Sequence, residues 1–264
     1  MINAERYRPQ APLPPELDAM ITLISNEPTL EQIWRTMDFV WQSLGCENRD
    51  PGSIQKFYAH PVWLLNGLFI EQHELSLENR RQMVEYIIPL QPARIADYGG
   101  GFGTLARMLC EQLPQAAIEI VEPFHSALAR QLAEPFKNLA YVPRLTGAYD
   151  LIIATDVLEH VSDPLQLVEL LANHLSPDGQ LLLANCFYPV ILCHLPETFH
   201  FRYSFTLLLD RMNLKKIGTV SYATVYASTG NNNITRAVRM LEVCSRLCFP
   251  ILVLLHKVWG KLMA

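Results

Sequence analysis

The sequence predicts an α/β fold, in which a doubly wound and mostly parallel sheet carries helices on both faces. Two observations support this fold class. From residue 93 onward, short apolar runs alternate with segments of helical spacing, as they do in βαβ units. A glycine-rich turn then follows the first apolar run, at the place where sheets of this kind bind small ligands.

Composition and spacing divide the chain into four regions. Residues 1–28 are Pro-rich and lack helical periodicity, so we expect an extended arm. Residues 29–90 carry apolar side chains at helical spacing and are expected to form a helical lid over the core. The α/β core occupies residues 91–230. A basic amphipathic helix is expected at 231–264.

Individual elements follow from spacing and from capping residues. Thr29 has the character of an N-cap for a helix that ends at Gly45. The segment 62–69 is apolar nearly all round, which favours a buried helix, and another helix is expected at 76–88. In the core we expect strands near 93–98, 117–122, 139–142, 150–154, 180–186, 215–220 and 222–227, with helices near 103–113, 124–134, 163–175 and 204–212.

The glycine-rich turn has the features of a small-molecule site. Gly99, Gly101 and Gly103 stand at alternate positions, where a ligand can approach the backbone without interference from Cβ atoms. The helix that follows offers unpaired N–H groups. A dinucleotide site has the pattern G-x-G-x-x-G/A, but here the third place falls on Thr104. The acid at Asp97 suits a ligand that bears an ammonium group and fits poorly beside a pyrophosphate.

Two later strand ends carry polar side chains. Glu122 ends the second strand, nineteen residues after Gly103, which is the separation expected for one intervening helix. A carboxylate at this strand end can accept hydrogen bonds from both hydroxyls of a ribose. The fourth strand ends at Thr155 and Asp156, and Glu159 and His160 follow it. Asp156 suits either the positioning of a substrate or the capping of the turn.

Four motifs in this order resemble the class I S-adenosylmethionine-dependent methyltransferases, in their small-molecule branch: IADYGGGFG, IEIVE, YDLIIATDVLEHVSDP and LSPDGQLLL. The resemblance covers roughly residues 80–220. It implies a Rossmann-like methyltransferase fold, S-adenosyl-L-methionine as cofactor, and methyl transfer to a small acceptor. Similar enzymes often carry an acid after the third strand, against adenine, and residues 141–145 contain none. Cofactor contacts are expected from Asp97, Gly99, Gly101, Gly103, Glu122, Pro123, Thr155 and Asp156.

Methyl transfer from a sulfonium needs orientation, exclusion of water and, for some acceptors, removal of a proton. Histidine can take a proton near neutral pH. His160 is one candidate base, and His194 and His200 lie in the connection after the fifth strand, which borders the acceptor pocket in similar enzymes. Packing and hydrogen bonding are the alternative role for each histidine. Substrate contacts are expected from Tyr58, His60, Trp63, Glu159 and Tyr203.

Composition restricts the partners. A net charge of −5 argues against an electrostatically driven nucleic-acid binder. The six cysteines form no C-x-x-C pair and have no matching histidines at zinc spacing, so we expect free thiols and no metal site. No apolar signal core appears near residue 1, so a cytoplasmic protein is expected, with membrane association as an addition.

The tail allows several interpretations. Residues 235–264 contain five Lys and Arg side chains and one acid, Glu242. Their apolar run, 247–255, is interrupted by Pro250 and is much shorter than the ~20 residues that span a bilayer. The tail therefore suits peripheral contact with a membrane, homodimerisation, or packing on the core.

The class of function and the acceptor remain open at this level. A non-catalytic methyltransferase-like binding protein and a nicotinamide-dependent oxidoreductase are the alternatives to a methyltransferase. The acceptor atom is oxygen, nitrogen or carbon, on a natural product, a lipid-like molecule or a sugar.

Overall fold

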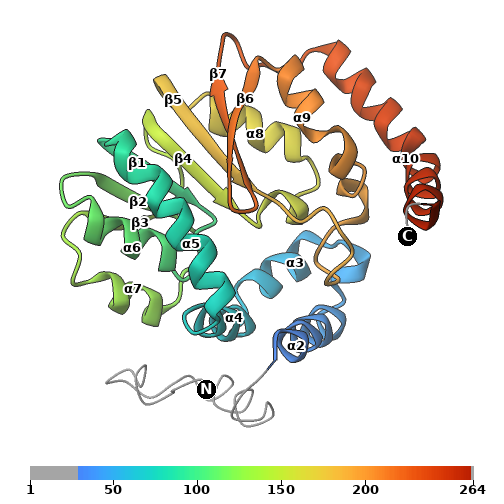
Figure 1. The fold of residues 1–264 in the computed structure, drawn as a ribbon. Helices are drawn as coiled ribbons and strands as arrows, with labels where there is room; N and C mark the ends of the chain where they lie inside the picture. The colour runs from blue at the N-terminus through green and yellow to red at the C-terminus, as the bar shows by residue number, and fades with distance from the viewer. Residues whose placement is uncertain (1–28, 263–264) are drawn as a thin grey trace.

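The computed structural model describes residues 29–262, and the side chains among them up to residue 255. The arm expected at 1–28 lies outside the described residues. A seven-stranded sheet of order β3-β2-β1-β4-β5-β7-β6 forms the centre of the molecule (Figure 1). The strands are β1 (Arg94–Tyr98), β2 (Ala117–Val121), β3 (Leu139–Val142), β4 (Tyr149–Thr155), β5 (Leu175–Ala184), β6 (Leu214–Val220) and β7 (Ala223–Ser228).

Strand pairing confirms the doubly wound, mostly parallel sheet. Pairs from β3 through β5 are parallel, and β7 runs antiparallel between β5 and β6. β5 begins at Leu175, earlier than the expected residue 180, because a register shift near Tyr149 lets Leu175 pair with it. Gly179 makes this close passage feasible, since a Cβ there would lie 2.9 Å from the carbonyl oxygen of Tyr149.

Helices cover both faces of the sheet, because successive strand residues point to opposite sides. Ile95, Ile118 and Ile153 pack in one core cluster with α5 (Glu74–Ile87) and α6 (Thr104–Gln112). The opposite cluster includes Ala96 and Ile152, packed against helices of the second half of the chain. These helices are α8 (Pro164–Ala172), α9 (Phe201–Arg211) and the long α10 (Arg236–Leu262).

A separate hydrophobic cluster lies over the carboxyl ends of the strands. It is formed by α2 (Leu30–Ser43), α3 (Pro51–Tyr58) and α4 (Val62–Ile70), with Ile33, Phe57 and Leu65 fully or almost fully buried. Side chains from loops at the strand ends, such as Phe102 and Cys193, complete this cluster. Helices α2 to α4 are called the cover below. Helix α5 was expected to belong with them, but it packs on the sheet beside α6.

The ends of the cover helices follow from local chemistry. Thr29 and Gln32 form a capping box at the start of α2. Helix α3 was not expected from the apolar spacing, and it begins because Asp50 caps it and Pro51 occupies its first position. α4 lies on the glycine-rich turn so closely that a Cβ at Gly67 would come within 2.7 Å of the Phe102 ring. The cover and the turn are therefore one packed unit.

The connection between β3 and β4 contains no helix, although such a crossover usually carries one. Residues 143–148 contain bends but no helix or strand. The connection leaves an open pocket of about 330 Å³ on the face of the sheet over β1 and β2. α7 (Ala127–Ala133) packs against β3 from the cover side, with Leu128 and Ala129 in the cluster of the cover.

Candidate active site

The glycine-rich turn forms a tight backbone cradle between β1 and α6. Gly99, Gly101 and Gly103 all have positive φ, at 69°, 50° and 76°, a conformation that other residues adopt only with strain. A Cβ at Gly99 would also lie 2.6 Å from a methyl carbon of Val157, and one at Gly103 would lie 2.7 Å from Ile120. Conformation and space therefore both require glycine here.

Asp97, the last buried residue of β1, has a carboxylate oxygen without a partner among the described residues. Its side chain is 2% exposed, and Oδ1 has no hydrogen-bond partner among the described residues. Burial raises the pKa of Asp97 to about 7, while the nearby positive charge of Arg80 lowers it. Buried polar atoms are nearly always hydrogen-bonded in native proteins. An orphaned acceptor next to the glycine turn therefore fits a cationic group of a bound ligand.

Glu122 directly follows β2 and borders the open pocket. The Phe124 amide donates a hydrogen bond of 2.9 Å to its Oε1, and burial raises the pKa of its carboxyl group. No acid lies between residues 141 and 145, and Pro143 and Leu145 of the short connection after β3 line the pocket. The pocket is lined by Tyr98, Gly99, Val121, Glu122, Pro123, Pro143, Arg144, Leu145, Leu170 and His174.

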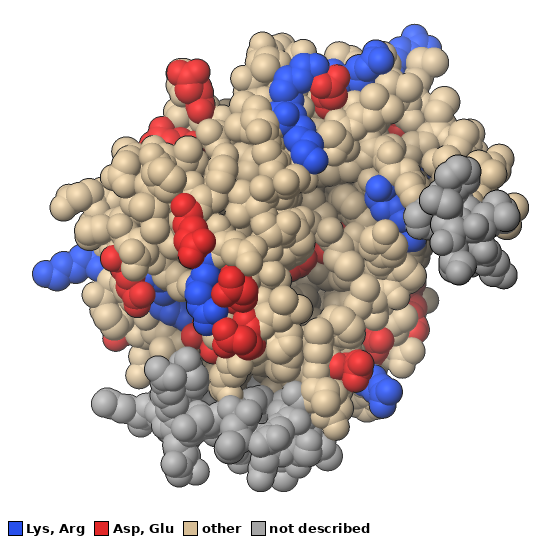
Figure 2. Space-filling view, viewed as in Figure 1, with Lys and Arg blue, Asp and Glu red and all other residues tan. Residues whose placement is uncertain are grey.

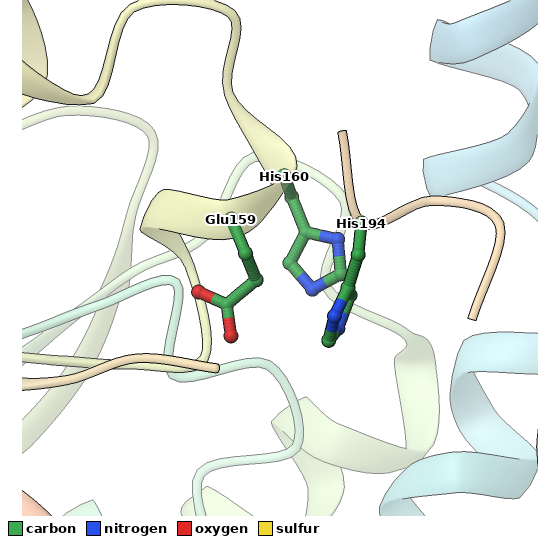
Figure 3. Close-up of side chains that lie close together, drawn as sticks. All are labelled: Glu159, His160 and His194. Atoms are coloured by element: carbon green, nitrogen blue, oxygen red, sulfur yellow. The ribbon is translucent and has the colours of Figure 1, made fainter. Parts of the chain in front are cut away.

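A second group of polar side chains meets beneath the cover: Glu159, His160 and His194 (Figure 3). Glu159 and His160 come from the short 3₁₀ turn after β4, Leu158–His160, and His194 comes from the loop after β5. One side-chain N or O atom from each lies within 4.8 Å of the others. The two imidazole rings lie 4.9 Å apart, edge to face. Loops separated by more than thirty residues thus meet at one point.

Hydrogen bonds orient both imidazoles of this group. Nδ1 of His160 lies 3.0 Å from the carbonyl oxygen of Cys193, and Nδ1 of His194 lies 2.7 Å from that of Tyr188. A carbonyl only accepts hydrogen bonds, so each Nδ1 carries the proton and donates it. Each Nε2 is then the unprotonated nitrogen, available to accept a proton or to bind a cation.

Burial controls the charge of the same group. It lowers the pKa of His160 to about 3 and also lowers the pKa of His194, so both rings are neutral at pH 7. Burial and the neighbouring Asp156 raise the pKa of Glu159 to about 8. Oε1 of Glu159 accepts the Cys186 amide at 2.8 Å, and its buried Oε2 has no partner among the described residues.

Asp156 connects this group to the cradle. It has a positive φ of 54°, uncommon for a residue with a side chain, and its Oδ2 accepts a hydrogen bond of 2.8 Å from the Tyr222 hydroxyl. Burial raises the pKa of Asp156, and the charge of Arg80 opposes this shift as it does for Asp97. Arg80 and Tyr222 were not expected at the site. Nothing in the sequence motifs marks them, because α5 and the β6–β7 turn reach the site only in the folded chain.

The remaining candidates separate into two sets. Tyr58 and Trp63 stack at 5.4 Å and present ring edges to His160, at 6.4 and 6.1 Å. Both rings therefore lie beside the group beneath the cover. Nδ1 of His60 instead accepts the Val62 amide at 3.2 Å, at the start of α4. Thr155 is half-buried at the end of β4.

His200 and Tyr203 contact helix α10, whereas the sequence suggested that they border the acceptor. Nδ1 of His200 is 2.9 Å from the hydroxyl of Ser245, and the Tyr203 ring packs against Phe249 at 6.1 Å. Both partners belong to α10. These two residues therefore join α9 to α10, and the structure does not group them with His160 and His194.

The trio of Glu159, His160 and His194 also forms a possible cation site, where the sequence indicated none. One carboxylate and two imidazoles are ligands that suit zinc and similar divalent ions. Sequence spacing gave no sign of it, because the third ligand lies on another loop. Figure 2 shows a hollow at the middle of this face of the molecule, with acidic side-chain atoms inside it.

Comparisons with known proteins agree with this architecture. The family described as "Methyltransferase domain" matches residues 71–205, just over half of the chain. The chain is similar to the ubiquinone biosynthesis O-methyltransferase of Ralstonia nicotianae, at 28% identity over 151 residues, covering 52% of this chain and 62% of that protein. The enzyme of the same name from Vibrio cholerae is 28% identical over 151 residues, covering 53% and 61%. The chain thus spans less than two thirds of these relatives.

Among solved structures, an O-methyltransferase family protein from Burkholderia thailandensis shares the fold. Its TM-score is 0.52 at 12% identity, and the match covers 81% of this chain and 77% of that one. The residues that match the family include the whole cradle and all three side chains of the group beneath the cover. The chain therefore belongs to the methyltransferase domain family.

Proposed function

We propose that this protein binds S-adenosyl-L-methionine in the glycine cradle and transfers its methyl group to a small organic acceptor. The bound cofactor supplies a methyl group on a positively charged sulfur. The observation that carries the proposal is the buried Asp97 carboxylate, whose Oδ1 has no partner among the described residues. An ammonium group is the partner that this acceptor needs.

Four parts of the chain would hold the cofactor. Asp97 binds the ammonium group, and Glu122 accepts both ribose hydroxyls. The positive-φ backbone from Gly99 to Gly103 allows close approach. The apolar pocket beside Pro143 and Leu145 receives the adenine, in place of an acid after β3. We assign the carboxylate of the methionine part to Arg80, because its charge acts on both Asp97 and Asp156.

For the acceptor we propose a hydroxyl group on an aromatic ring, with His194 as the base. Nε2 of His194 takes the hydroxyl proton, while Nδ1–H is held by the Tyr188 carbonyl. The carboxylates of Asp156 and Asp38 raise the pKa of His194 against the effect of burial, and none acts on His160 in this way. His160 then positions the His194 ring. The names of the relatives, ubiquinone biosynthesis O-methyltransferases, support an oxygen acceptor.

We propose that the enzyme is cytoplasmic and can associate with a membrane surface. All six cysteines are free thiols, as expected for a reducing compartment such as the cytoplasm. The cover helices place Tyr58 and Trp63 over the group, which suits an acceptor with an apolar aromatic part. Such an acceptor partitions into membranes when it carries an apolar chain, which supports peripheral membrane association. A homodimer through α10 is the second partner arrangement proposed.

Calorimetric titration with S-adenosyl-L-methionine tests the cofactor site. We expect binding by the native protein and loss of binding after Asp97→Ala together with Glu122→Ala. Asp210→Asn serves as the control, because Asp210 is an exposed acid paired with Lys215. Equal affinity in the double variant would contradict the proposal. Binding of NAD in place of S-adenosyl-L-methionine would support an oxidoreductase instead.

A specific observation also favours a metal-assisted variant of this function. If Glu159, His160 and His194 hold a divalent cation, both Nε2 atoms are occupied and neither ring acts as a base. Metal analysis of the purified protein, with and without a chelator, separates the two possibilities. A stoichiometric cation that is lost on Glu159→Gln would replace the His194 base with a metal-bound acceptor. Cofactor bound without any transfer to a panel of phenols would favour a non-catalytic binding protein.

A further inference from the structure

Helix α10 exposes a continuous apolar stripe to solvent, here called the outer stripe. Its members recur three or four residues apart, so they share one face of the helix. Each is more than half exposed, although large apolar side chains are usually covered. The outer stripe consists of Met240, Val243, Leu247, Ile251, Leu254 and Leu255.

The opposite face of α10 is fixed to the body of the protein. Val238 is buried in the core cluster, and Ser245 bonds to His200 and Ser204 of the α9 region. Arg239 forms an ion pair of 2.6 Å with Asp163 at the start of α8. These contacts set the rotation of the helix, so the fold itself turns the outer stripe away from the core.

Helix α10 carries more basic than acidic side chains. At 100° per residue, Arg246 falls on one flank of the outer stripe, and Arg236 falls within its arc at the first residue of the helix. The sequence has two further Lys at positions 257 and 261. The only acid of α10 is Glu242, which is buried and pairs with Arg239 and Arg246. Helix α10 therefore combines an exposed apolar face with an excess of basic over acidic side chains.

Neighbouring segments extend this surface toward the interior. Tyr203 packs on Phe249 of α10, and Leu207, one helical turn further along α9, is also exposed. The Arg202 guanidinium lies over the rings of Phe249 and Tyr188, at 5.0 and 4.2 Å. Arg202 also lines a pocket of about 210 Å³ that reaches Tyr222, the hydrogen-bond donor to Asp156. Figure 1 shows α9 and α10 together along one outer edge of the molecule.

We propose that the outer stripe docks on an anionic lipid surface, with its apolar side chains at the acyl boundary and the basic side chains of α10 on the headgroups. An amphipathic helix with these two features binds membranes in this orientation. A second copy of the chain is disfavoured as the occupant, because symmetric pairing of two outer stripes would bring together two helices that each carry five basic residues and one acid. Docking does not depend on the proposed methyl transfer.

Flotation of the full chain with lipid vesicles tests the proposal. We expect binding to phosphatidylcholine vesicles that contain about 30 mol % phosphatidylglycerol, and much weaker binding without the anionic lipid. Leu247→Glu with Ile251→Glu should lower the partition coefficient at least about ten-fold. Arg236→Gln with Arg246→Gln should lower it about ten-fold or more on anionic vesicles only. Leu75→Glu is the matched control, because Leu75 is an equally exposed leucine on α5.

Two results would overturn the proposal. Partitioning unchanged by the two glutamates, in a protein whose circular dichroism spectrum is native, removes the outer stripe from any membrane contact. A dimer in light scattering that the same substitutions dissociate, together with no vesicle binding by the native chain, assigns the outer stripe to a second copy. Calorimetric binding of S-adenosyl-L-methionine should be equal in all these variants, so a failure here is distinct from a failure of the proposed enzyme function.

Discussion

The glycine cradle and the group beneath the cover lie close together, but they are built in different ways. The cradle is a contiguous stretch whose function comes mainly from backbone conformation, from Asp97 to Gly103. Glu159, His160 and His194 come from two loops and owe their properties to burial under helices from the other end of the chain. The first site is therefore visible in a short motif, whereas the second exists only after the cover has packed. The two should respond differently to substitution.

The largest effect is expected at the group beneath the cover. His194→Ala should lower kcat about 10²- to 10⁴-fold, the usual contribution of a general base, and leave the affinity for S-adenosyl-L-methionine unchanged. His160→Gln should lower kcat less, because the ring only positions its neighbour. Steady-state kinetics with a phenolic acceptor and calorimetry together check this. A joint loss of cofactor affinity would show that the two sites are not separable.

Gly99→Ala should damage the cradle through conformation and space. A side chain at φ 69° is strained, and the new Cβ would lie 2.6 Å from Val157. We expect a loss of about 3 kcal/mol in the free energy of unfolding and at least about ten-fold weaker cofactor binding. Gly218→Ala is the matched control, since no atom lies within 4 Å of its Cβ position. Denaturant melts of the two variants should differ clearly, and equal stability would contradict the cradle geometry.

The raised pKa of Asp97 makes the stability of the folded protein depend on pH. Its pKa is raised to about 7 in the folded chain from 3.8, so the folded protein binds a proton that the unfolded chain releases between those values. The apo protein should therefore lose stability as pH rises from about 4 to above 7, by up to about 4 kcal/mol. Asp97→Asn should reduce this slope and weaken cofactor binding, while the raised pKa of Glu159 keeps a slope of the same sign in the variant. Thermal melts across that range check both, and an unchanged slope in the variant would assign it to Glu159 or another group.

The smallest expected effect is at the junction of the two sites. Tyr222→Phe removes the hydroxyl that donates to Asp156 and leaves this carboxylate with one partner fewer. We expect a loss of about 1–2 kcal/mol in stability, and a few-fold rise in KM for the acceptor with little change in kcat. Thr206→Val is the control for loss of a hydroxyl. Thr206 forms a hydrogen bond with the Tyr226 hydroxyl. A large fall in kcat would assign Tyr222 to the chemistry.

Sequence reasoning reached the cradle correctly, because alternating glycines after an apolar strand permit few other structures. The strands, their mostly parallel arrangement and the helices on both faces followed in the same way from local periodicity. Helix α3 and the early start of β5 did not follow, since a cap at Asp50 and a register shift at Tyr149 determine them. The sequence assigned α5 to the lid, but in the structure α5 packs on the sheet. Amphipathic spacing shows that one face of a helix is buried, but it does not show which element buries that face.

The same difference between local sequence patterns and long-range packing applies to the functional side chains. The family, the glycine turn and the positions of Asp97 and Glu122 could be inferred from the chain alone, because they depend on neighbours a few residues away or on one intervening helix. The separation of His194 from His200, the arrival of Arg80 and Tyr222, and the outward rotation of α10 required the folded molecule. Each of these depends on packing between segments far apart in the chain, and periodicity within one segment carries no information about that packing.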